Sequence, residues 1–443
     1  MPANGPAKLL ASVLVALAAA CAQPQAGTLY RDFTLIDGSG AAPMADAAML
    51  VNEAGQITWV GPQAEAPRAR TVVTLDDAYV IPGLIDLHVH LGVVNGLTLN
   101  SDNFTEENVE RELATYASYG VTSVLTMGTD KDLIFALRDT QRAGRPDRAR
   151  IFTTGQGIVF RTGYGGVPGV NEPVSTPEEA VRAVALQAEK GVDFIKFWVD
   201  PELGTMPPMP PEISQAIINA AHAHNLRAVA HIFYLEDAQR LVDQGVDGLV
   251  HGVRDQEVDA RLITAMRERG VWQIAQTLSR EASMFAYGES APFLTDPFFL
   301  RGVAAETVAE LANPARQARI AASPHFHDFP EFLGAAQRNL MLLKQGGVAI
   351  AFGTDSGAPA RFPGFFAHWE LQLMVEAGFT PLEAITAATG HAAAFLQDGS
   401  IGVIMPDRWA DFVVLEADPV EDIMNTRAIS AVYIAGQEVW AQP

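Results

Sequence analysis

Two histidines separated by one residue stand at the end of an apolar run, where residues 85–90 read IDLHVH. Alternate side chains of a strand share one face, so Asp86, His88 and His90 would point the same way. Imidazole nitrogen is a common ligand for divalent metals. The pair alone is weak evidence, because two hydrogen-bonded core histidines give the same pattern. Asp86 either orients a ligand or accepts backbone amides at the buried start of the strand.

Four more residues with metal-ligand or proton-transfer chemistry lie in or just after other apolar runs: Lys196, His231, His251 and Asp355. Lys196 is the most informative, because residues 194–198 read FIKFW and are otherwise suited to complete burial. An unpaired ammonium would be costly there. The charge of Lys196 must therefore be removed or matched.

The elements that position these residues alternate between strands and helices. Eight apolar runs of strand length occur, at residues 84–90, 122–127, 150–154, 194–199, 228–232, 248–251, 271–275 and 348–352. Segments with helical periodicity follow them, as at 178–190, where Val181, Val184, Ala185 and Ala188 fall on one face. Eight such units predict an α/β fold, a (β/α)8 TIM barrel, with an open doubly wound sheet as the alternative. In a barrel the strand ends share one rim, so the histidines, Lys196 and Asp355 would converge there.

Both ends of the chain carry alternating patterns with turn residues instead. We predict one small β-sandwich domain composed of residues 27–80 and 400–443, with the barrel at 81–399. The aromatic-rich segment 277–347 would serve as a lid or pocket for an apolar group, or pack extra helices.

The first 21 residues resemble an export signal. Lys8 precedes a twelve-residue apolar run, 9–20, that ends in small residues and is too short to span a bilayer. Residues 17–21 resemble a bacterial lipoprotein signal, in which Cys21 would be lipidated and anchor the protein to a membrane; ordinary cleavage nearby is the alternative. We expect an exported protein, periplasmic or membrane-anchored. As the only cysteine, Cys21 permits no intramolecular disulfide.

Composition narrows the class of protein further. The 443 residues have a formal net charge of −22 and are 49% hydrophobic, which excludes disorder. The acidic balance repels phosphate backbones and no basic stripe interrupts it, so we expect no nucleic-acid partner. Whether the protein forms a homo-oligomer stays open.

Three motifs resemble the binuclear-metal branch of the amidohydrolase superfamily. They are PGLIDLHVH at 82–90, GVTSV at 120–124 and GTD at 353–355. Within the superfamily the chain looks most like the imidazolonepropionase and prolidase-type enzymes, which include metal-dependent dipeptidases and carboxypeptidases. The resemblance covers essentially the whole chain after the signal.

The resemblance implies a ligand set for two divalent cations, Zn²⁺ by preference with Mn or Fe also suitable. His88, His90 and Asp355 would bind the more buried ion, and His231 and His251 the more exposed one. Lys196, carboxylated by carbon dioxide, would bridge both. Such a carbamate resolves the cost of the buried lysine, because the amine becomes an anionic ligand between two cations.

The implied reaction is hydrolysis of a C–N amide bond in a small dipeptide-like or N-acyl amino acid substrate. A metal-bridging hydroxide would attack, with Asp355 as catalytic proton shuttle. Ester or lactone hydrolysis and cyclic-amide opening need the same site and remain alternatives. An exported binding protein without chemistry is a more remote one.

Substrate contacts are expected from loops on the same rim. Arg161 and Arg254 follow the third and sixth strands, and each would either clamp a substrate carboxylate or form a rim salt bridge. Tyr164 lies in a glycine-rich loop on that rim. Related dipeptidases place a tyrosine two residues after the fifth-strand histidine, where this chain has Phe233, with Tyr234 one position later. That departure weakens the peptidase interpretation.

Overall fold

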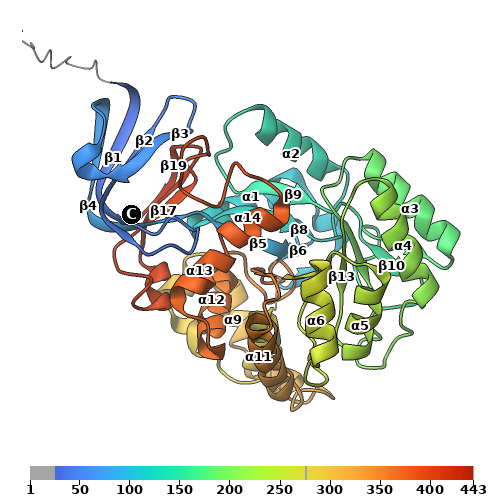
Figure 1. The fold of residues 1–443 in the computed structure, drawn as a ribbon. Coiled ribbons are helices and arrows are strands. Elements are labelled where there is room, and N and C mark those ends of the chain that lie inside the picture. The colour runs from blue at the N-terminus through green and yellow to red at the C-terminus, as the bar shows by residue number, and fades with distance from the viewer. Residues whose placement is uncertain (1–24, 275–276, 443) are drawn as a thin grey trace, which may run out of the picture.

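A computed structural model describes residues 25–274 and 277–442, and shows eight parallel strands that form a barrel. The strands are β5 (Leu84–Val89), β8 (Val121–Thr126), β9 (Arg150–Thr153), β12 (Ile195–Trp198), β13 (Ala228–His231), β14 (Gly248–Val250), β15 (Trp272–Ile274) and β16 (Ile350–Ala351). Each coincides with one of the predicted runs. The predicted α/β barrel is therefore confirmed (Figure 1).

Hydrogen bonds close this barrel across two seams between the ladders β5-β8-β9 and β12-β13-β14-β15-β16. At one seam the amide of Leu87 donates to the carbonyl of Phe352 at 3.1 Å, which joins β5 to the end of β16. At the other, the amide of Asp193 donates to the carbonyl of Thr153 at 2.8 Å, which joins β9 to the start of β12. The carboxyl ends of all eight strands therefore lie around one rim.

Helices cover the outside of the barrel (Figure 1). They include α1 (Glu106–Ser118), α2 (Leu133–Ala143), α3 (Pro177–Glu189), α4 (Pro211–Ala223), α5 (Leu235–Gln244), α6 (Ala260–Arg269), α11 (Phe329–Gln345), α12 (Phe365–Ala377), α13 (Pro381–Ala387) and α14 (Gly390–Leu396). In α3 the buried residues are Ala180, Ala183, Val184 and Gln187, whereas Val181 is 46% exposed. The predicted apolar stripe was therefore wrong by about one position. No helix in the described ranges is both long and apolar enough to cross a bilayer.

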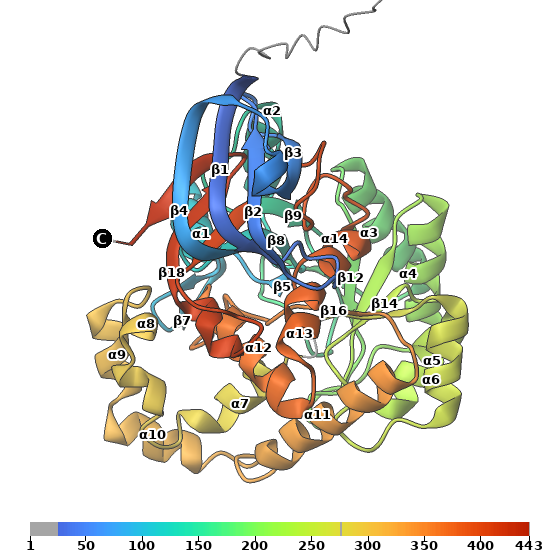
Figure 2. The same cartoon turned by 60° about the vertical axis from the view of Figure 1, so that its left-hand side comes forward.

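Strands from the two ends of the chain form one seven-stranded sheet (Figure 2). Its order is β19 (Gln437–Ala441), β18 (Ile429–Ile434), β17 (Phe412–Leu415), β4 (Ala69–Pro82), β1 (Gln25–Leu35), β2 (Met44–Val51) and β3 (Ile57–Pro62). The β4 strand joins the two groups, because it pairs with β1 on one side and β17 on the other. The ring of Tyr30 on β1 lies 5.2 Å from that of Phe412 and 5.4 Å from that of Tyr433. Since β4 and β17 separate β1 from β18 in the order, the sheet folds over a shared core.

The segment between β15 and β16 packs extra helices against the barrel. It contains α7 (Leu278–Ala286), α8 (Pro297–Leu300), α9 (Ala305–Leu311), α10 (Pro314–Ala321) and α11. The ring of Phe293 lies 5.1 Å from those of Phe299 and Trp369 and 5.3 Å from that of Phe365. These aromatic residues thus serve helix packing, which was one of the two expected roles. The predicted signal, 1–21, with Cys21, lies outside the described residues.

The carboxyl of Glu112 on α1 is buried beneath the loop that follows β5. It accepts the amide of Gly92 at 2.7 Å, and burial raises its pKa to about 8. In the unfolded chain this carboxyl ionises near pH ~4.3, whereas the folded protein keeps it protonated to a higher pH. Its contribution to the free energy of unfolding is therefore complete at low pH and is lost as the pH rises from about 4 to about 8.

We therefore expect Glu112→Gln, which keeps an acceptor oxygen without a titrating proton, to flatten this pH dependence. Thermal unfolding followed from pH 5 to 9 should show a wild-type melting temperature that falls more steeply than that of the variant, with a difference of several degrees at pH 9. Glu107→Gln, an exposed change on the same helix, is the control. Parallel wild-type and Glu112→Gln curves would contradict the assignment.

Candidate metal centre and active site

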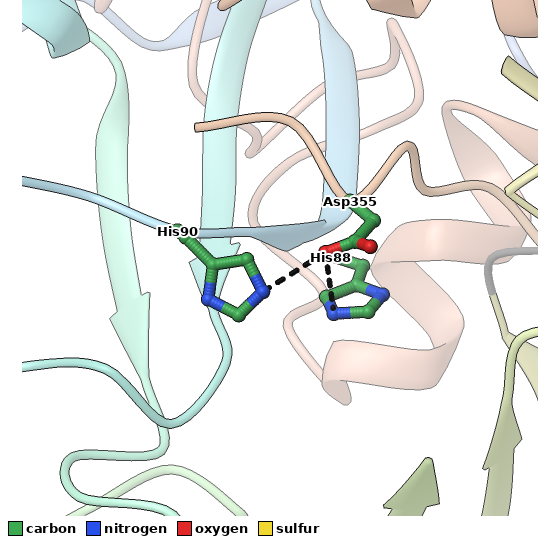
Figure 3. A group of neighbouring side chains, drawn as sticks. All are labelled: His88, His90 and Asp355. Atoms are coloured by element: carbon green, nitrogen blue, oxygen red, sulfur yellow. Dashed lines mark ion pairs between the residues drawn. The ribbon is translucent and has the colours of Figure 1, made fainter. Parts of the chain in front are cut away.

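The first three predicted ligands meet at the rim of the barrel (Figure 3). His90 Nε2 lies 2.9 Å and His88 Nε2 lies 3.5 Å from Oδ1 of Asp355. One ligand atom from each residue lies within 4.8 Å of the others, as a single metal ion would require. The strand alternation of β5 aims both histidines inward, as the sequence predicted.

The backbone at Asp355 is held in an unusual conformation that brings its carboxylate to the histidines. Asp355 has φ 61°, in the left-handed region, and its amide donates to the carbonyl of His88 at 2.7 Å. Gly357 follows with φ 86°, and a Cβ there would lie 1.7 Å from the carbonyl oxygen of His90. Only glycine therefore permits this close approach of the loop to β5.

Asp86 supports the backbone of this site and makes no contact with a histidine ring. Its carboxylate accepts the amides of His88 at 3.1 Å and Thr354 at 3.0 Å, together with the Thr354 hydroxyl at 2.6 Å. Burial raises its pKa to about 7. Of the two expected roles, the geometry favours the acceptor of backbone amides.

The remaining three predicted ligands come from β12, β13 and the end of β14 and lie in the same mouth. The ring of His251 lies 4.2 Å from that of His231 and 4.9 Å from that of His88. Lys196 is fully buried, and its charge acts on His88 and His231. All six predicted residues are thus brought together.

The amine of Lys196 has no hydrogen-bond partner among the described residues. Burial lowers its pKa to about 7, since the neighbouring Asp355 and Asp200 offset only part of the cost of a buried charge. Its nearest aromatic neighbour is Trp198, whose ring centre lies 4.8 Å from Nζ. An amine in this environment loses its proton readily, which is the state that reacts with carbon dioxide.

The donor set fits divalent cations. Burial lowers the pKa of His88, His90 and His251 below the usual value and that of His231 to about 4, so the rings are neutral and offer a lone pair. Threonine hydroxyls hydrogen-bond to the Nδ1 atoms of two of these imidazole rings. His90 Nδ1 lies 3.0 Å from Thr129 Oγ1, and His251 Nδ1 lies 2.6 Å from Thr277 Oγ1. This outer contact is the arrangement that orients metal-binding imidazoles.

Asp200, which we did not single out from the sequence, also belongs to this site. Its Oδ2 lies 2.5 Å from Nε2 of His231. Burial opposes its ionisation, but His231 outweighs that effect and lowers the pKa of Asp200 to about 2. The sequence did contain a signal that could have identified Asp200. Asp200 directly follows the fourth apolar run, and Asp355 follows the eighth run within three residues in the same way.

Two arginines that sequence reasoning also missed lie on the other oxygen of Asp355. Arg280 Nε lies 3.2 Å from Oδ2, and Arg361 Nη1 forms an ion pair with the same atom. Burial favours the neutral acid, but Arg361 and the two histidines outweigh it and hold the pKa of Asp355 well below its usual range. Both arginines lie in loops or helices after the strands. The alternation of residues along the strands does not predict where side chains in those segments point.

The four expected substrate-binding residues differ in position. Tyr164 lines the cavity, and its ring lies 5.4 Å from that of His231. Arg254 is buried behind the cavity and bonded to Glu281 at 2.8 Å and the carbonyl of Ile232 at 2.9 Å. Tyr234 is half-buried at the start of α5, with its ring 4.8 Å from that of Phe233. Neither it nor Arg254 lines the cavity.

Arg161 points away from the site. Its guanidinium is exposed and donates to Ser175 Oγ at 2.9 Å and to the carbonyl of Pro173 at 3.0 Å, in the neighbouring loop and β11 (Glu172–Val174). This arrangement corresponds to the rim contact that was the alternative to a carboxylate clamp. Arg161 directly follows β10 (Ile158–Phe160), which lies between β11 and β12 in the sheet, and it also forms an ion pair with Glu179 at 3.6 Å.

The cavity has a volume of about 200 Å³ and opens directly over the candidate metal ligands. His88, His90, His231, His251 and Asp355 all line it, together with Trp198 and the loop residue Tyr164. Apolar contacts come from Val93, Leu99 and Val167. A small substrate with an apolar side chain fits such a space.

Comparison with known proteins agrees with this architecture. The sequence model of the Amidohydrolase family matches residues 79–439. Ochratoxinase of Aspergillus niger is 26% identical over 447 residues, covering 91% of this chain and 84% of that protein. Imidazolonepropionase of Deinococcus radiodurans is 26% identical over 443 residues, covering 94% and 96%.

Among solved structures, that of a Xaa-Pro dipeptidase with bound methionine in its active site superposes with a TM-score of 0.71 at 22% identity. The superposition covers 94% of this chain and 100% of that one. At 22% identity, the superposition shows that the two proteins share a fold. The resemblance of the strand motifs to imidazolonepropionase and prolidase-type enzymes is thus confirmed. The chain belongs to the Amidohydrolase family and is a hydrolytic enzyme.

Proposed function

We propose that this enzyme hydrolyses a C–N amide bond in a small dipeptide-like or N-acyl amino acid substrate. The observation that carries the proposal is the convergence of four neutral imidazoles and one carboxylate on one cavity, with the unpartnered buried amine of Lys196 close enough for its charge to act on His88 and His231. The names of the relatives support it, since imidazolonepropionase, ochratoxinase and Xaa-Pro dipeptidase appear among them.

The family resemblance supplies the assignment of residues to two divalent cations, and the His88, His90 and Asp355 group supports the first of them. His88, His90 and Asp355 would hold one ion, and His231 and His251 the other, with carboxylated Lys196 between them. Zn²⁺ suits these nitrogen and oxygen donors, as do Mn and Fe. When bound, such cations lower the pKa of a water molecule and polarise the substrate carbonyl.

The residues of the chain would then direct the proton. Asp355 Oδ1 faces His88 and His90, and its Oδ2 faces the cavity and the arginines. Asp355 would accept a proton from the attacking water as the new C–O bond forms at the carbonyl carbon, and then deliver it to the amine nitrogen, so that the C–N bond breaks and the amine leaves. Tyr164, whose ring stands edge-on to His231, would contact the substrate beside the scissile bond.

The test combines metal exchange with a substrate panel. We expect the purified protein to lose activity after chelation and regain it with Zn²⁺, Mn²⁺ or Fe²⁺. Hydrolysis of dipeptides and N-acetyl amino acids should exceed that of an ester, a lactone and a cyclic amide of matched side chain. Preference for the ester or lactone would assign the site to the alternative chemistry. Bound metal without turnover of any compound would favour a binding protein and reject the proposal.

We also propose that the protein is exported, on the basis of the apolar run 9–20 followed by Cys21. A lipid on Cys21 would hold the enzyme at a membrane surface on the periplasmic side. Intact-mass analysis of the chain produced in a bacterial host decides this. A mature chain that begins with a diacylated Cys21 is expected, whereas a free thiol or a start beyond Cys21 would reject lipidation.

A further inference from the structure

Ion pairs beside the metal ligands contain one more guanidinium than carboxylate. Glu281 pairs with Arg254 and Arg280, and Asp355 pairs with Arg280 and Arg361. Within the described ranges these three arginines form no ion pair with any other carboxylate. Glu202 acts on Arg280 only at longer range. Three guanidinium groups thus share two directly paired carboxylates, and the charge of Asp200 also acts on Arg254.

Only one of these three guanidinium groups lines the cavity. Arg254 and Arg280 lie behind the cavity, and each donates to Glu281. Among the described lysines and arginines, Arg361 alone lines the cavity, with 19% of its side chain exposed. Its Nη1 binds Asp355, and its other guanidinium nitrogens have no hydrogen-bond partner among the described residues.

The backbone fixes where Arg361 stands. Its amide donates to the carbonyl of Ala358 at 2.9 Å, and its carbonyl accepts the amide of Gly357 at 2.8 Å. This short closed turn follows Asp355 by only two residues and holds the Cα of Arg361 against the site. The guanidinium therefore has a limited reach, which covers the cavity above the metal ligands.

We propose that Arg361 is the anion-binding residue of the cavity and selects substrates with a free carboxylate next to the scissile amide. The free donors of a guanidinium match the two oxygens of a carboxylate. This role replaces the one expected of Arg161 and Arg254, neither of which lines the cavity and both of which hydrogen-bond to other groups. The inference rests on the proposed function for the identity of the reacting bond.

The test compares an acid with its neutral counterpart. N-acetyl-L-leucine and N-acetyl-L-leucinamide differ only at the carboxyl group, and the leucine side chain suits the apolar wall formed by Val93, Leu99 and Val167. Arg361→Gln should raise KM for the acid about 10- to 100-fold and change KM for the amide less than about threefold. Arg361→Lys should lie between wild type and Arg361→Gln, because it keeps the charge without the paired donors.

Arg261→Gln is the matched control, because it removes one exposed arginine that pairs with Asp243 on the far side of α5 and α6. It should behave as wild type with both compounds. Melting temperatures verify that every variant is folded. Equal changes for acid and amide in Arg361→Gln, or no change for either, would overturn the proposal.

A second readout separates this inference from the proposed function. Calorimetric titration of N-acetyl-L-leucine into chelator-treated protein measures binding without turnover. Arg361→Gln should weaken that binding at least about tenfold relative to wild type. If the enzyme cleaves neither compound but this loss is observed, the proposed reaction fails and the anion site stands. Unchanged binding of the acid in Arg361→Gln overturns the anion site, whatever the enzyme hydrolyses.

Discussion

Replacing Lys196 with methionine should lower kcat/KM on the order of 10³-fold while leaving the fold intact. Lys196 is fully buried in the site, and its amine has no hydrogen-bond partner among the described residues. A purely structural lysine would be paired, so the unpartnered amine indicates a role that needs chemical modification. Methionine fills the same space and cannot form a carbamate.

The same substitution should not destabilise the protein. Burial already disfavours the charged amine and lowers its pKa to about 7, so removal of the amine removes a cost of folding. We expect an unchanged or higher melting temperature in chelator-treated protein, where metal makes no contribution, together with the loss of turnover in the metal-loaded enzyme. Metal content, measured by mass spectrometry, should fall from two ions per chain toward one or none.

The control for Lys196→Met is Lys190→Met, which removes a lysine that binds Asp132 at the surface. It should retain wild-type activity. Labelled bicarbonate gives an independent signal, because ¹³C NMR should detect a carbamate in the wild-type protein and none in Lys196→Met. Full activity in Lys196→Met would exclude the bridging role.

Asp355→Asn should lower kcat about 10²- to 10⁴-fold, the usual range for loss of a general acid–base group. The amide keeps an oxygen toward His88 and His90, so much of the bound metal should remain. It cannot accept the proton of the attacking water. Steady-state kinetics with metal analysis on the same sample distinguish loss of proton transfer from loss of metal.

A stability change should accompany this variant. Asp355 carries the negative charge opposite Arg280 and Arg361, and its removal leaves two guanidinium groups with less compensation. Loss of one partner of a buried ion pair typically costs about 3–5 kcal/mol, so a lower melting temperature is expected. Asp243→Asn, at an exposed ion pair, is the control. A fully active Asp355→Asn enzyme would end the assignment.

The strand framework could be predicted because it depends on local pattern. Parallel barrel strands are buried on both faces, so each appears as an apolar run, and all eight were found. His88, His90, His231 and His251 stood at the ends of those runs and could be placed on one rim by topology alone. The α3 stripe was shifted because alanine fits either face, and only tertiary packing left Val181 at the surface.

The arginines could not be placed in the same way. Arg280 and Arg361 are held by a helix and a turn beyond the strands, and the ion pairs they form depend on the three-dimensional course of those segments. Arg161 follows a strand directly and was expected at the cavity, but it contacts Ser175, Pro173 and Glu179 instead. The positions of the strand ends therefore could not predict the loop arginines, whereas they could have predicted Asp200.

The position of β4 between the two terminal groups has a consequence for biosynthesis. The ribosome delivers β1 to β4 first, but the partner of β4 on its other side, β17, is among the last segments to emerge. Until then one edge of β4 offers unpaired amides and carbonyls to any neighbouring strand. A nascent or truncated chain that ends before residue 412 should therefore be prone to aggregation and should depend on chaperones until synthesis is complete.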